Sequence, residues 1–271
     1  MKIKNHRLFY SDDKQVPYFL SPNTGGNYQP QYLVMHYTAA TSASSAISWF
    51  KSPIAQASAH LVIGRDGAVT QCAPFNLVTW HAGKSQWKGI NGLNRYSIGI
   101  ELVNAGRLIR AGDRFICAVD RKVIDSADVI KAKHKNETTE NYWQEYTAEQ
   151  MSVALEVAAA LVKHYSLKDV IGHEDISPIR KSDPGPAFPM ASFRAKAMGR
   201  VNESLDEYEA STVLNIRSGP GSNYPTLTDA LPKGTKLLAL KTEGTWTFVE
   251  VIDVVHGMMD LEGWVSTKYL I

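Results

Sequence analysis

Three side chains close together in the sequence could do chemistry as a group: the imidazole of His173, the ammonium of Lys181 and the carboxylate of Asp183. Histidine nitrogen and carboxylate oxygen are donors that a hydrolytic Zn²⁺ uses, and such a site needs three protein ligands and one open position. The third donor has to come from elsewhere in the chain. The best candidate is His36, which follows the apolar run 32–35. The pattern predicts a zinc hydrolase.

A lone histidine at the end of an apolar strand is, by itself, more typical of a hydrogen-bonded core residue than of a metal ligand. The surroundings of Asp183 favour the metal interpretation, because the sequence Pro-Gly-Pro at 184–186 restricts the backbone just after the carboxylate. With His36 and His173, this aspartate would complete a two-histidine, one-carboxylate set that keeps the ion strongly Lewis acidic.

Two more charged residues suit a hydrolytic centre. Glu101 lies in the apolar stretch 97–103, where a carboxylate is unfavourable unless it is paired or functional. It is therefore either salt-bridged at the end of a strand or the base that takes a proton from the attacking water. Lys181 is either an ordinary exposed lysine or the cation that stabilises the oxyanion of a tetrahedral intermediate.

The segment 80–83 offers an aromatic ring at Trp80, an imidazole at His81 and a glycine. These residues suit the wall of a sugar- or peptide-binding cleft, and a buried tryptophan beside a hydrogen-bonded histidine is the equal alternative. His60 opens an apolar strand. We expect it to be structural, or to orient a ligand histidine through its other ring nitrogen.

The elements that must position these residues alternate between strands and helices over the first two hundred residues. Short apolar runs predict strands at 32–37, 60–63, 68–71, 97–103 and 170–171. Helices are expected at 44–51 and 147–165, the second beginning with a capping box of Thr147 and Gln150. Such alternation predicts a layered α/β domain.

The remaining segments differ in composition. The polar stretch 105–146 is expected to be a solvated loop with a hairpin near 114–123, or else a lid, because it directly follows the strand that carries Glu101. Residues 196–210 predict a linker. From 211 to 271, short strands separated by turn residues predict a small all-β barrel, close to the lower size limit for independent folding.

Length, charge and cysteine content exclude several classes of protein. The 271 residues favour one large and one small domain, and a net charge of +2 is too small to argue for nucleic-acid binding. No apolar run is long enough for a membrane-spanning helix. The basic N-terminus lacks a following apolar region, so we expect no signal peptide and synthesis as a soluble cytoplasmic protein. Cys72 and Cys117 are expected to be buried thiols rather than a disulfide.

Five motifs occur in an order that resembles a known enzyme family. They are Tyr-Leu-Val-Met-His-Tyr-Thr at 32–38, Ser-Ala-His-Leu-Val-Ile-Gly-Arg-Asp-Gly at 58–67, Trp-His-Ala-Gly at 80–83, Ser-Ile-Gly-Ile-Glu-Leu at 97–102, and the stretch 172–188 that begins with Gly-His. Over roughly residues 25–195 the chain resembles the zinc-dependent N-acetylmuramoyl-L-alanine amidases of the type 2 family. That family includes anhydro-muropeptide recycling amidases, and shares its fold with a phage lysozyme and the peptidoglycan recognition proteins.

This resemblance implies a mixed central sheet flanked by helices, with His36, His173 and Asp183 as zinc ligands. It also implies that Glu101 is the catalytic glutamate and Lys181 the catalytic lysine. The reaction would be hydrolysis of the amide between the lactyl group of N-acetylmuramic acid and the L-alanine of the stem peptide. The chain has aspartate at 183 and alanine at 59, where the phage and recognition-protein branches have cysteine and tyrosine, so it sides with the bacterial recycling-type branch.

The C-terminal segment resembles a bacterial SH3 domain, on Leu-Asn-Ile-Arg-Ser-Gly-Pro-Gly at 214–221 and Gly-Trp-Val-Ser-Thr-Lys-Tyr-Leu at 263–270. Such modules commonly bind cell-wall peptide, and a passive stabilising cap is the alternative. The resemblance thus implies a zinc amidase domain at 1–195, a linker at 196–210 and an SH3 domain at 211–271, with peptidoglycan or a muropeptide as the partner.

Two other functions remain open at this point. One is a non-catalytic muropeptide recognition protein, a branch that typically lacks a metal ligand. The other is cytosolic recycling of soluble anhydro-muropeptides, which the lack of a leader favours, whereas the barrel favours polymeric cell wall reached after lysis or by non-classical export. Neither the oligomeric state nor the preferred stem peptide follows from the sequence.

Overall fold

The computed structural model describes residues 1–199, 206–258 and 261–271. The chain divides into two compact units, the first made of residues 1–130 and 142–185 and the second of residues 131–141 and 186–271. Residues 200–205, in the middle of the expected linker, lie outside the described residues.

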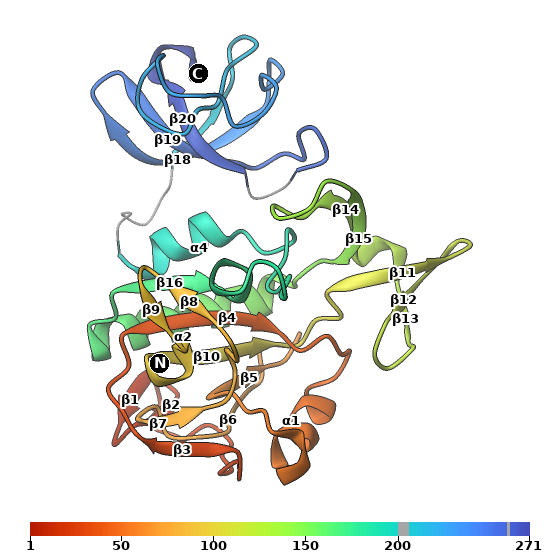
Figure 1. Ribbon diagram of the computed structural model, residues 1–271, viewed down its shortest axis with the longest axis vertical. Helices are drawn as coiled ribbons and strands as arrows, with labels where there is room; N and C mark the ends of the chain where they lie inside the picture. The colour runs from red at the N-terminus through yellow and green to blue at the C-terminus, as the bar shows by residue number, and fades with distance from the viewer. Residues whose placement is uncertain (200–205, 259–260) are drawn as a thin grey trace. The chain divides into compact units, whose positions relative to one another are not determined.

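The first unit is built on a five-stranded sheet with the strand order β16-β4-β10-β5-β6 (Figure 1). Its strands are β4 (Tyr32–Tyr37), β5 (Leu61–Ile63), β6 (Val69–Gln71), β10 (Ser97–Leu102) and β16 (Asp169–Gly172). Neighbouring strands from β16 to β5 are parallel and β6 is antiparallel to β5, so the sheet is mixed as expected. The first five residues of β4 are buried, because strands inside a parallel sheet are covered on both faces.

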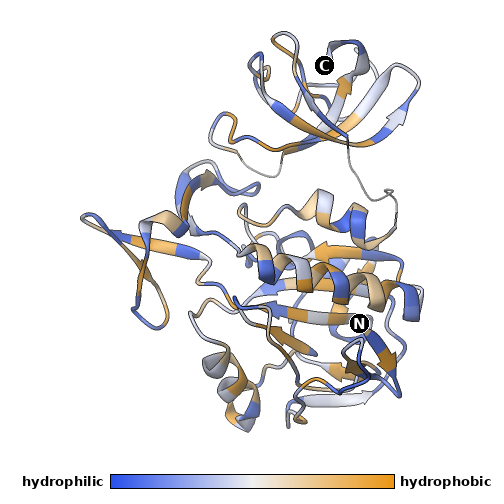
Figure 2. Cartoon of the chain, turned by 180° about the vertical axis from the view of Figure 1, so that it is seen from behind, coloured by the Kyte–Doolittle hydropathy of each residue, from blue (hydrophilic) through white to orange (hydrophobic). Residues whose placement is uncertain are grey.

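Helix α2 (Ala148–Tyr165) lies across one face of this sheet, behind it in Figure 1 and in front of it in Figure 2. Thr147 caps the helix as predicted, since its Oγ1 accepts the Gln150 N–H at 3.1 Å. The second half of the predicted capping box is wrong. The Gln150 amide instead donates to the carbonyl oxygens of Ile63 and Val103, at 3.0 and 3.1 Å, and so joins the helix to the ends of β5 and β10.

The other helices of this unit are short. Helix α1 (Ala43–Lys51) begins after Ser42, whose hydroxyl accepts the Ser45 N–H, and ends just before Pro53, as the sequence predicted. Helix α3 (His173–Ile176) follows β16 directly. The single-turn 3₁₀ helices are η1 (Pro53–Ala55), η2 (Leu93–Arg95) and η3 (Ser126–Asp128). Three short antiparallel pairs also belong to this unit: β1 (Lys2–Lys4) with β2 (Arg7–Phe9), β3 (Thr24–Asn27) with β7 (Leu77–Thr79), and β8 (Gln86–Trp87) with β9 (Ile90–Asn91).

The polar stretch after β10 is not the solvated loop that its composition suggested. It forms a sheet in the order β13-β12-β11-β15-β14, from β11 (Arg107–Ala111), β12 (Arg114–Cys117), β13 (Val123–Ile124), β14 (Val129–Lys133) and β15 (Glu140–Gln144). The hairpin predicted near 114–123 is present as β12 and β13. We call the segment 105–146 the insert. A small buried cluster of Ala105, Leu108, Cys117 and Ile124 stabilises it, and in the sequence these few apolar residues are spread among charged ones.

The second unit contains helix α4 (Met190–Ala197) and an antiparallel sheet in the order β17-β18-β19-β20. Its strands are β17 (Glu207–Glu209), β18 (Lys236–Glu243), β19 (Trp246–Val251) and β20 (Leu261–Ser266), followed by the 3₁₀ helix η4 (Thr267–Tyr269). Apolar residues from the strands and from the segment 210–231 form a buried core, including Leu214, Ile216, Leu237, Val249 and Val265. β17 lies within the stretch that was expected to be a linker. The beginning of the region expected to contain short strands, residues 212–221, forms only isolated bridges, such as Leu214 with Leu231.

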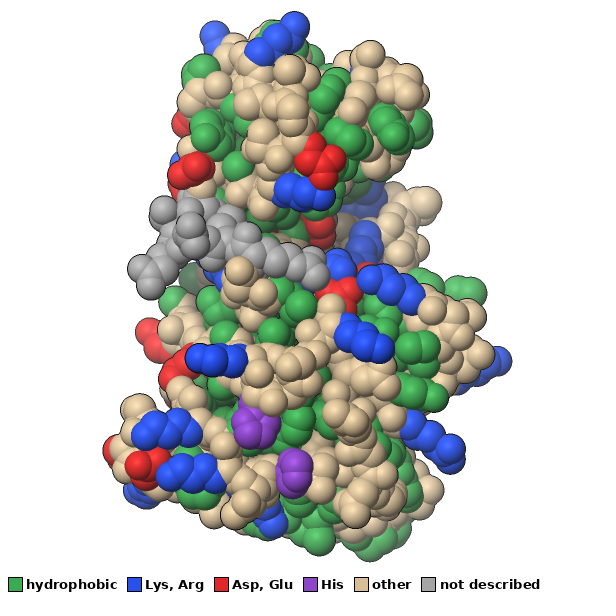
Figure 3. Space-filling model, turned by 90° about the vertical axis from the view of Figure 1, so that its left-hand side faces the viewer, with side chains coloured by type: hydrophobic (Ala, Val, Ile, Leu, Met, Phe, Trp, Pro, Cys, Tyr) green, Lys and Arg blue, Asp and Glu red, His purple; other side chains and the backbone are tan. Residues whose placement is uncertain are grey.

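Surface and thiol properties agree with the sequence. Within the described residues, none of the helices is both long enough and apolar enough to cross a membrane. Cys72 and Cys117 are buried and not joined in a disulfide. On the face drawn in Figure 3, Lys and Arg side chains are scattered among acidic and uncharged residues rather than gathered in one patch.

Candidate metal centre and active site

Three neighbouring parallel strands bring the candidate residues together at their carboxyl ends. β10 pairs with β4 so that Glu101 lies opposite His36, and β16 pairs with β4 so that Gly172 lies opposite Met35. His173 is the next residue after Gly172 and therefore lies beside His36. The carboxyl ends of parallel strands are the usual place for a site in a sheet of this kind.

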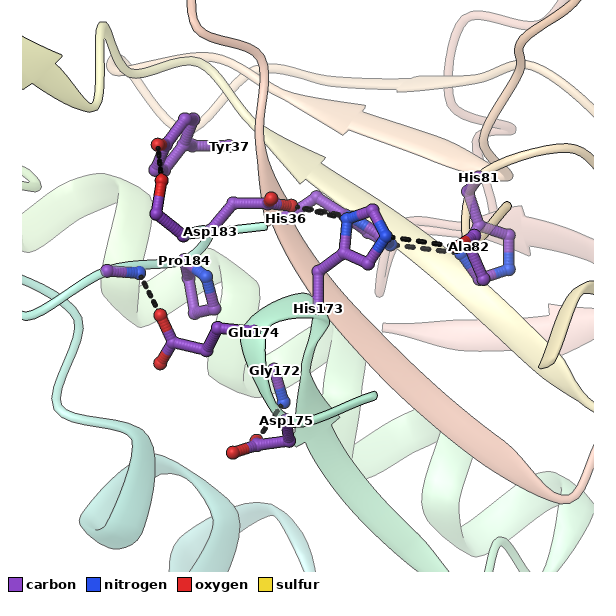
Figure 4. Close-up of polar contacts among 12 residues, drawn as sticks. His36, Tyr37, His81, Ala82, Gly172, His173, Glu174, Asp175, Asp183 and Pro184 are labelled. Carbon is purple, nitrogen blue, oxygen red and sulfur yellow. Dashed lines mark hydrogen bonds and ion pairs between the residues drawn. The ribbon is translucent and has the colours of Figure 1, made fainter. Parts of the chain in front are cut away.

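The three predicted metal ligands converge (Figure 4). His36 Nδ1, His173 Nδ1 and Asp183 Oδ2 form a triangle in which each pair of atoms is 2.9 Å apart. All three residues are buried. A tetrahedral zinc ion with bonds of about 2.0–2.1 Å holds its ligand atoms about 3.3 Å apart, so the triangle needs to widen only by a few tenths of an ångström. The donor set and its geometry fit zinc.

Hydrogen bonds behind the two histidines decide which ring nitrogen faces the cluster. His81 Nε2 is 3.1 Å from the carbonyl oxygen of Ser97, which can only accept, so His81 carries its proton there. Its Nδ1 then accepts from His36 Nε2 at 2.9 Å. His173 Nε2 donates to the carbonyl oxygen of Ala82 at 3.1 Å. Both ligand histidines therefore present an unprotonated Nδ1 to the cluster.

The contact with a predicted ligand histidine that was suggested for His60 is made by His81 instead. His60 accepts the Gly99 N–H at Nδ1 and donates from Nε2 to the carbonyl oxygen of Leu77, and none of its hydrogen bonds in the described structure reaches a ligand histidine. The ring of His81 packs on Gly99, where a Cβ atom would come within 2.5 Å of its Cγ, so only glycine fits. His81 and Trp80 both line the cleft over the cluster, His81 as a buried residue.

The backbone that carries Asp183 is tied to the start of α3. The Glu174 N–H donates to the Asp183 carbonyl oxygen at 2.8 Å, and the Glu174 carboxylate accepts the Gly185 N–H at 3.1 Å. The Tyr146 hydroxyl donates to the Pro184 carbonyl oxygen at 2.7 Å. These bonds hold the third ligand in place from both sides.

Tyr37 supports the same loop from β4. Its hydroxyl is 2.8 Å from the Ser182 hydroxyl, between Lys181 and Asp183. The tyrosine ring occupies the space beside Gly106, where a Cβ atom would lie only 2.4 Å from the ring, and the positive φ of 64° at that position also favours glycine. The strand that supplies one ligand thus also positions the loop that supplies another.

Sequence reasoning missed Arg180. Its guanidinium donates to the carbonyl oxygens of Ala82 and Lys84, at 2.9 and 3.1 Å. The Ala82 carbonyl oxygen also accepts from His173, so Arg180 fixes the segment that orients this ligand. About one hundred residues separate the partners in the sequence, and no local pattern could have revealed the contact.

The electrostatics of the cluster suit a cation. Burial, helped by the neighbouring His173, lowers the pKa of His36 to about 4, so the ring is neutral at pH 7, as a metal ligand must be. Burial opposes the charge of Asp183, but the two histidine rings beside its carboxylate, first His173 and then His36, prevail and hold its pKa well below the usual range. Burial, and then the charge of Asp183, raises the pKa of Glu101 well above its ordinary value. Glu101 Oε2 is buried and has no hydrogen-bond partner among the described residues.

A cleft of about 870 Å³ opens over the cluster, within the range of sites that bind small organic molecules. All seven residues selected from the sequence line it: His36, Trp80, His81, Glu101, His173, Lys181 and Asp183. Helix α1 and the turn between β12 and β13 contribute further wall residues, among them Trp49 and Val119.

Comparison with known proteins agrees with this architecture. Residues 26–186 match the family described as N-acetylmuramoyl-L-alanine amidase. The chain is 35% identical over 139 residues to the 1,6-anhydro-N-acetylmuramyl-L-alanine amidase AmpD of Escherichia coli K12, covering 51% of this chain and 56% of that protein. It is 29% identical over 176 residues to the N-acetylmuramoyl-L-alanine amidase AmiD of the same strain, covering 62% and 53%. The chain thus spans about half the length of these curated relatives.

Among solved structures, the crystal structure of a Se-Met derivative of AmpD superposes with a TM-score of 0.51 at 25% sequence identity. The alignment covers 72% of this chain and 99% of that one. The family match includes both histidines and the aspartate of the triangle and extends over more than half of the sequence. This chain therefore belongs to the N-acetylmuramoyl-L-alanine amidase family.

Proposed function

We propose that the protein is a zinc-dependent N-acetylmuramoyl-L-alanine amidase that hydrolyses the amide between the lactyl group of N-acetylmuramic acid and the L-alanine of the stem peptide. The observation that carries this proposal is the buried triangle of His36 Nδ1, His173 Nδ1 and Asp183 Oδ2. The same cleft contains Glu101, whose buried Oε2 has no hydrogen-bond partner among the described residues. The names of the relatives, each an amidase of this bond type, support the choice of reaction.

Zinc, when bound by His36, His173 and Asp183, would act as a Lewis acid toward the scissile carbonyl and increase the acidity of the attacking water. Glu101 would accept the proton of that water, a task that suits a carboxylate whose pKa is raised by burial. The same group would then deliver the proton to the leaving nitrogen of L-alanine as the carbon–nitrogen bond breaks.

Lys181 and Trp80 would act on the substrate rather than on the water. The ammonium of Lys181 would stabilise the negative charge that develops on the carbonyl oxygen, since it lines the same cleft as the ligands. Trp80 offers an aromatic surface to the substrate. His81 and Arg180 would act indirectly, by holding the two ligand histidines in the tautomer and position described above.

We also propose the boundaries of the domains and the role of each. Residues 1–195 would form the catalytic domain, 196–210 a linker, and 211–271 a bacterial SH3 domain that holds the enzyme on cell wall. A groove of about 440 Å³ in the second unit supports the last assignment, because aromatic and cationic residues line it, among them Arg217, Trp246, Lys268 and Tyr269. Peptides with carboxylates would suit such a groove.

Two measurements test the amidase proposal. Digestion of purified peptidoglycan should release stem peptides with a free L-alanine amine and create no new reducing sugar ends; new reducing ends would show that a different bond is cut. Chelation should abolish the activity, and zinc should restore it. A muropeptide recognition protein would bind without releasing peptide, and the presence of every predicted ligand disfavours that alternative.

A second candidate is recycling of soluble anhydro-muropeptides, which the 35% identity to a relative named as a 1,6-anhydro-N-acetylmuramyl-L-alanine amidase favours. Comparing the rates on intact sacculi and on soluble anhydro-muropeptide separates the two. A strong preference for the soluble substrate, unchanged when the groove residue Trp246 is replaced by alanine, would favour recycling.

A further inference from the structure

One wall of the catalytic cleft has no part in the mechanism above. It contains two large apolar side chains that remain exposed: Val119, with 64% of its surface accessible, and Trp49, with 54%. Val119 lies in the turn between β12 and β13, and Trp49 in helix α1. Large apolar side chains left exposed along a cleft are typical of surfaces that contact a ligand.

The turn that carries Val119 is fastened to the catalytic sheet. Asp120 Oδ2 accepts both the backbone N–H of Thr41, at 3.0 Å, and its hydroxyl, at 2.5 Å. A second bond lies beside this pair. Cys117, three residues before Asp120, donates from Sγ to the carbonyl oxygen of Ala39, two residues before Thr41, at 3.4 Å. We call the Asp120–Thr41 pair the latch.

The latch is close in the sequence to one of the proposed metal ligands. Thr41 lies in the segment that connects His36, on β4, to helix α1. The insert also has its own buried cluster, which includes Cys117. The turn is therefore tied to the wall of the cleft by these hydrogen bonds and by this cluster.

Charge is unevenly distributed around the cleft. The lining Asp, Glu, Lys and Arg residues are Glu101, Arg180, Lys181 and Asp183, all from β10 or the loop that ends at Asp183. The lining residues from 38–50 and from the turn are apolar or carry hydroxyl groups. A stem peptide carries several carboxylates, whereas an N-acetylated sugar presents C–H faces and an acetyl methyl group. The uncharged wall thus suits the sugar, and tryptophan suits the face of a sugar ring.

We propose that Val119 and Trp49 form the subsite for the N-acetylated sugar, and that the latch makes the insert a specificity-determining element. This inference rests on the proposed amidase function, because it assigns one half of that substrate to one wall. It predicts that changes in the turn weaken binding of the sugar product and leave binding of the peptide product unchanged.

The test is an NMR titration of the zinc-loaded full chain with two separate ligands, N-acetylmuramic acid and the free stem peptide. Val119→Ser should raise the Kd for the sugar at least about threefold, because it removes apolar contact area, and change the Kd for the peptide less than about twofold. Val123→Ser is the matched control, since Val123 belongs to the same insert, is 55% exposed and does not line the cleft.

The latch is tested in the same way with Asp120→Ala and with the milder Thr41→Val, which removes only the hydroxyl donor. Both should weaken sugar binding in the same direction as Val119→Ser. An equal loss for sugar and peptide, no change for either, or the absence of saturable sugar binding to the wild type would overturn the inference. Turnover of muropeptide by the wild type reports separately on the proposed function, so the two failures are distinguishable.

Discussion

His36 and Glu101 lie opposite one another on the neighbouring parallel strands β4 and β10, at the ends where both strands leave the sheet. This register places the proposed metal ligand and the proposed carboxylate base side by side without any contribution from a loop. Strands inside a sheet are held by hydrogen bonds on both edges, so the separation of the two side chains is set by the spacing of the strands, about 4.8 Å.

Asp183→Ala should remove the third donor of the triangle. We expect zinc affinity to fall by more than about 100-fold, since even residues behind a ligand change it by roughly 10- to 100-fold, and activity should be lost with it. Zinc content after dialysis and amidase rate are the measurements. Asp113→Ala, at an exposed position in the insert, is the control and should retain both. Full zinc occupancy in Asp183→Ala would contradict the ligand assignment.

Glu101→Gln should separate chemistry from metal binding. The amide has the same shape but cannot accept a proton, so kcat should fall by about 10²- to 10⁴-fold while bound zinc stays at one per chain. Rates at saturating substrate and metal analysis on the same samples test this. A variant that keeps wild-type kcat would remove Glu101 from the mechanism, and a variant that loses zinc would make it a structural residue.

The hydroxyl contact between Tyr37 and Ser182 should matter for rate more than for zinc. Tyr37→Phe and Ser182→Ala each release the loop that contains Lys181 and Asp183, and we expect each to lower kcat by about 10-fold, corresponding to the loss of about one hydrogen bond. The double variant should be no worse than either single one, because both remove the same interaction. Additive losses would show that the two residues act independently.

His81→Ala should weaken zinc binding without removing a ligand. His81 Nδ1 accepts a hydrogen bond from His36 Nε2. Losing such a partner typically lowers metal affinity by about 10- to 100-fold. Competition with a chelator of known affinity measures this change. His164→Ala, at an exposed position on α2, serves as the histidine control. Unchanged zinc affinity in His81→Ala would mean that the sheet alone orients His36.

Glu250 on β19 predicts a pH dependence of stability in the second unit. Burial raises its pKa from 4.5 to about 7, and its carboxylate accepts the Ser192 N–H at 2.9 Å. The folded state therefore binds the proton more tightly than the unfolded state, so this group favours folding below pH 4.5 and loses that contribution as the pH rises through 7.

Glu250→Gln keeps an acceptor and removes the charge. At pH 8 it should stabilise this unit by up to about 3 kcal/mol relative to the wild type, and at pH 4 the two should be alike. Thermal unfolding at both pH values measures the difference, with Glu243→Gln at an exposed position as the control. Equal stability of variant and wild type at pH 8 would show that Glu250 pays no burial penalty.

Much of the fold could be predicted because its signals are local. Short, mostly apolar segments mark β4 and β10, and a capping threonine marks the start of α2. The segment 105–146 forms a sheet where the sequence predicts a loop, because its strands carry many charged residues. Only the pairing of β11 with β12 and β15 buries the few apolar ones.

The types of these side chains, the place of His36, Glu101 and His173 at strand ends and the Pro-Gly-Pro after Asp183 are properties of the sequence by itself, and they were enough to select the four residues. The tertiary structure alone decided which residues orient them. His81 rather than His60 contacts His36, and Arg180 reaches across to Ala82, because strand order and loop packing bring these positions together. Contacts between residues that are 45 to 100 positions apart depend on the whole fold, so a local pattern of residues cannot predict them.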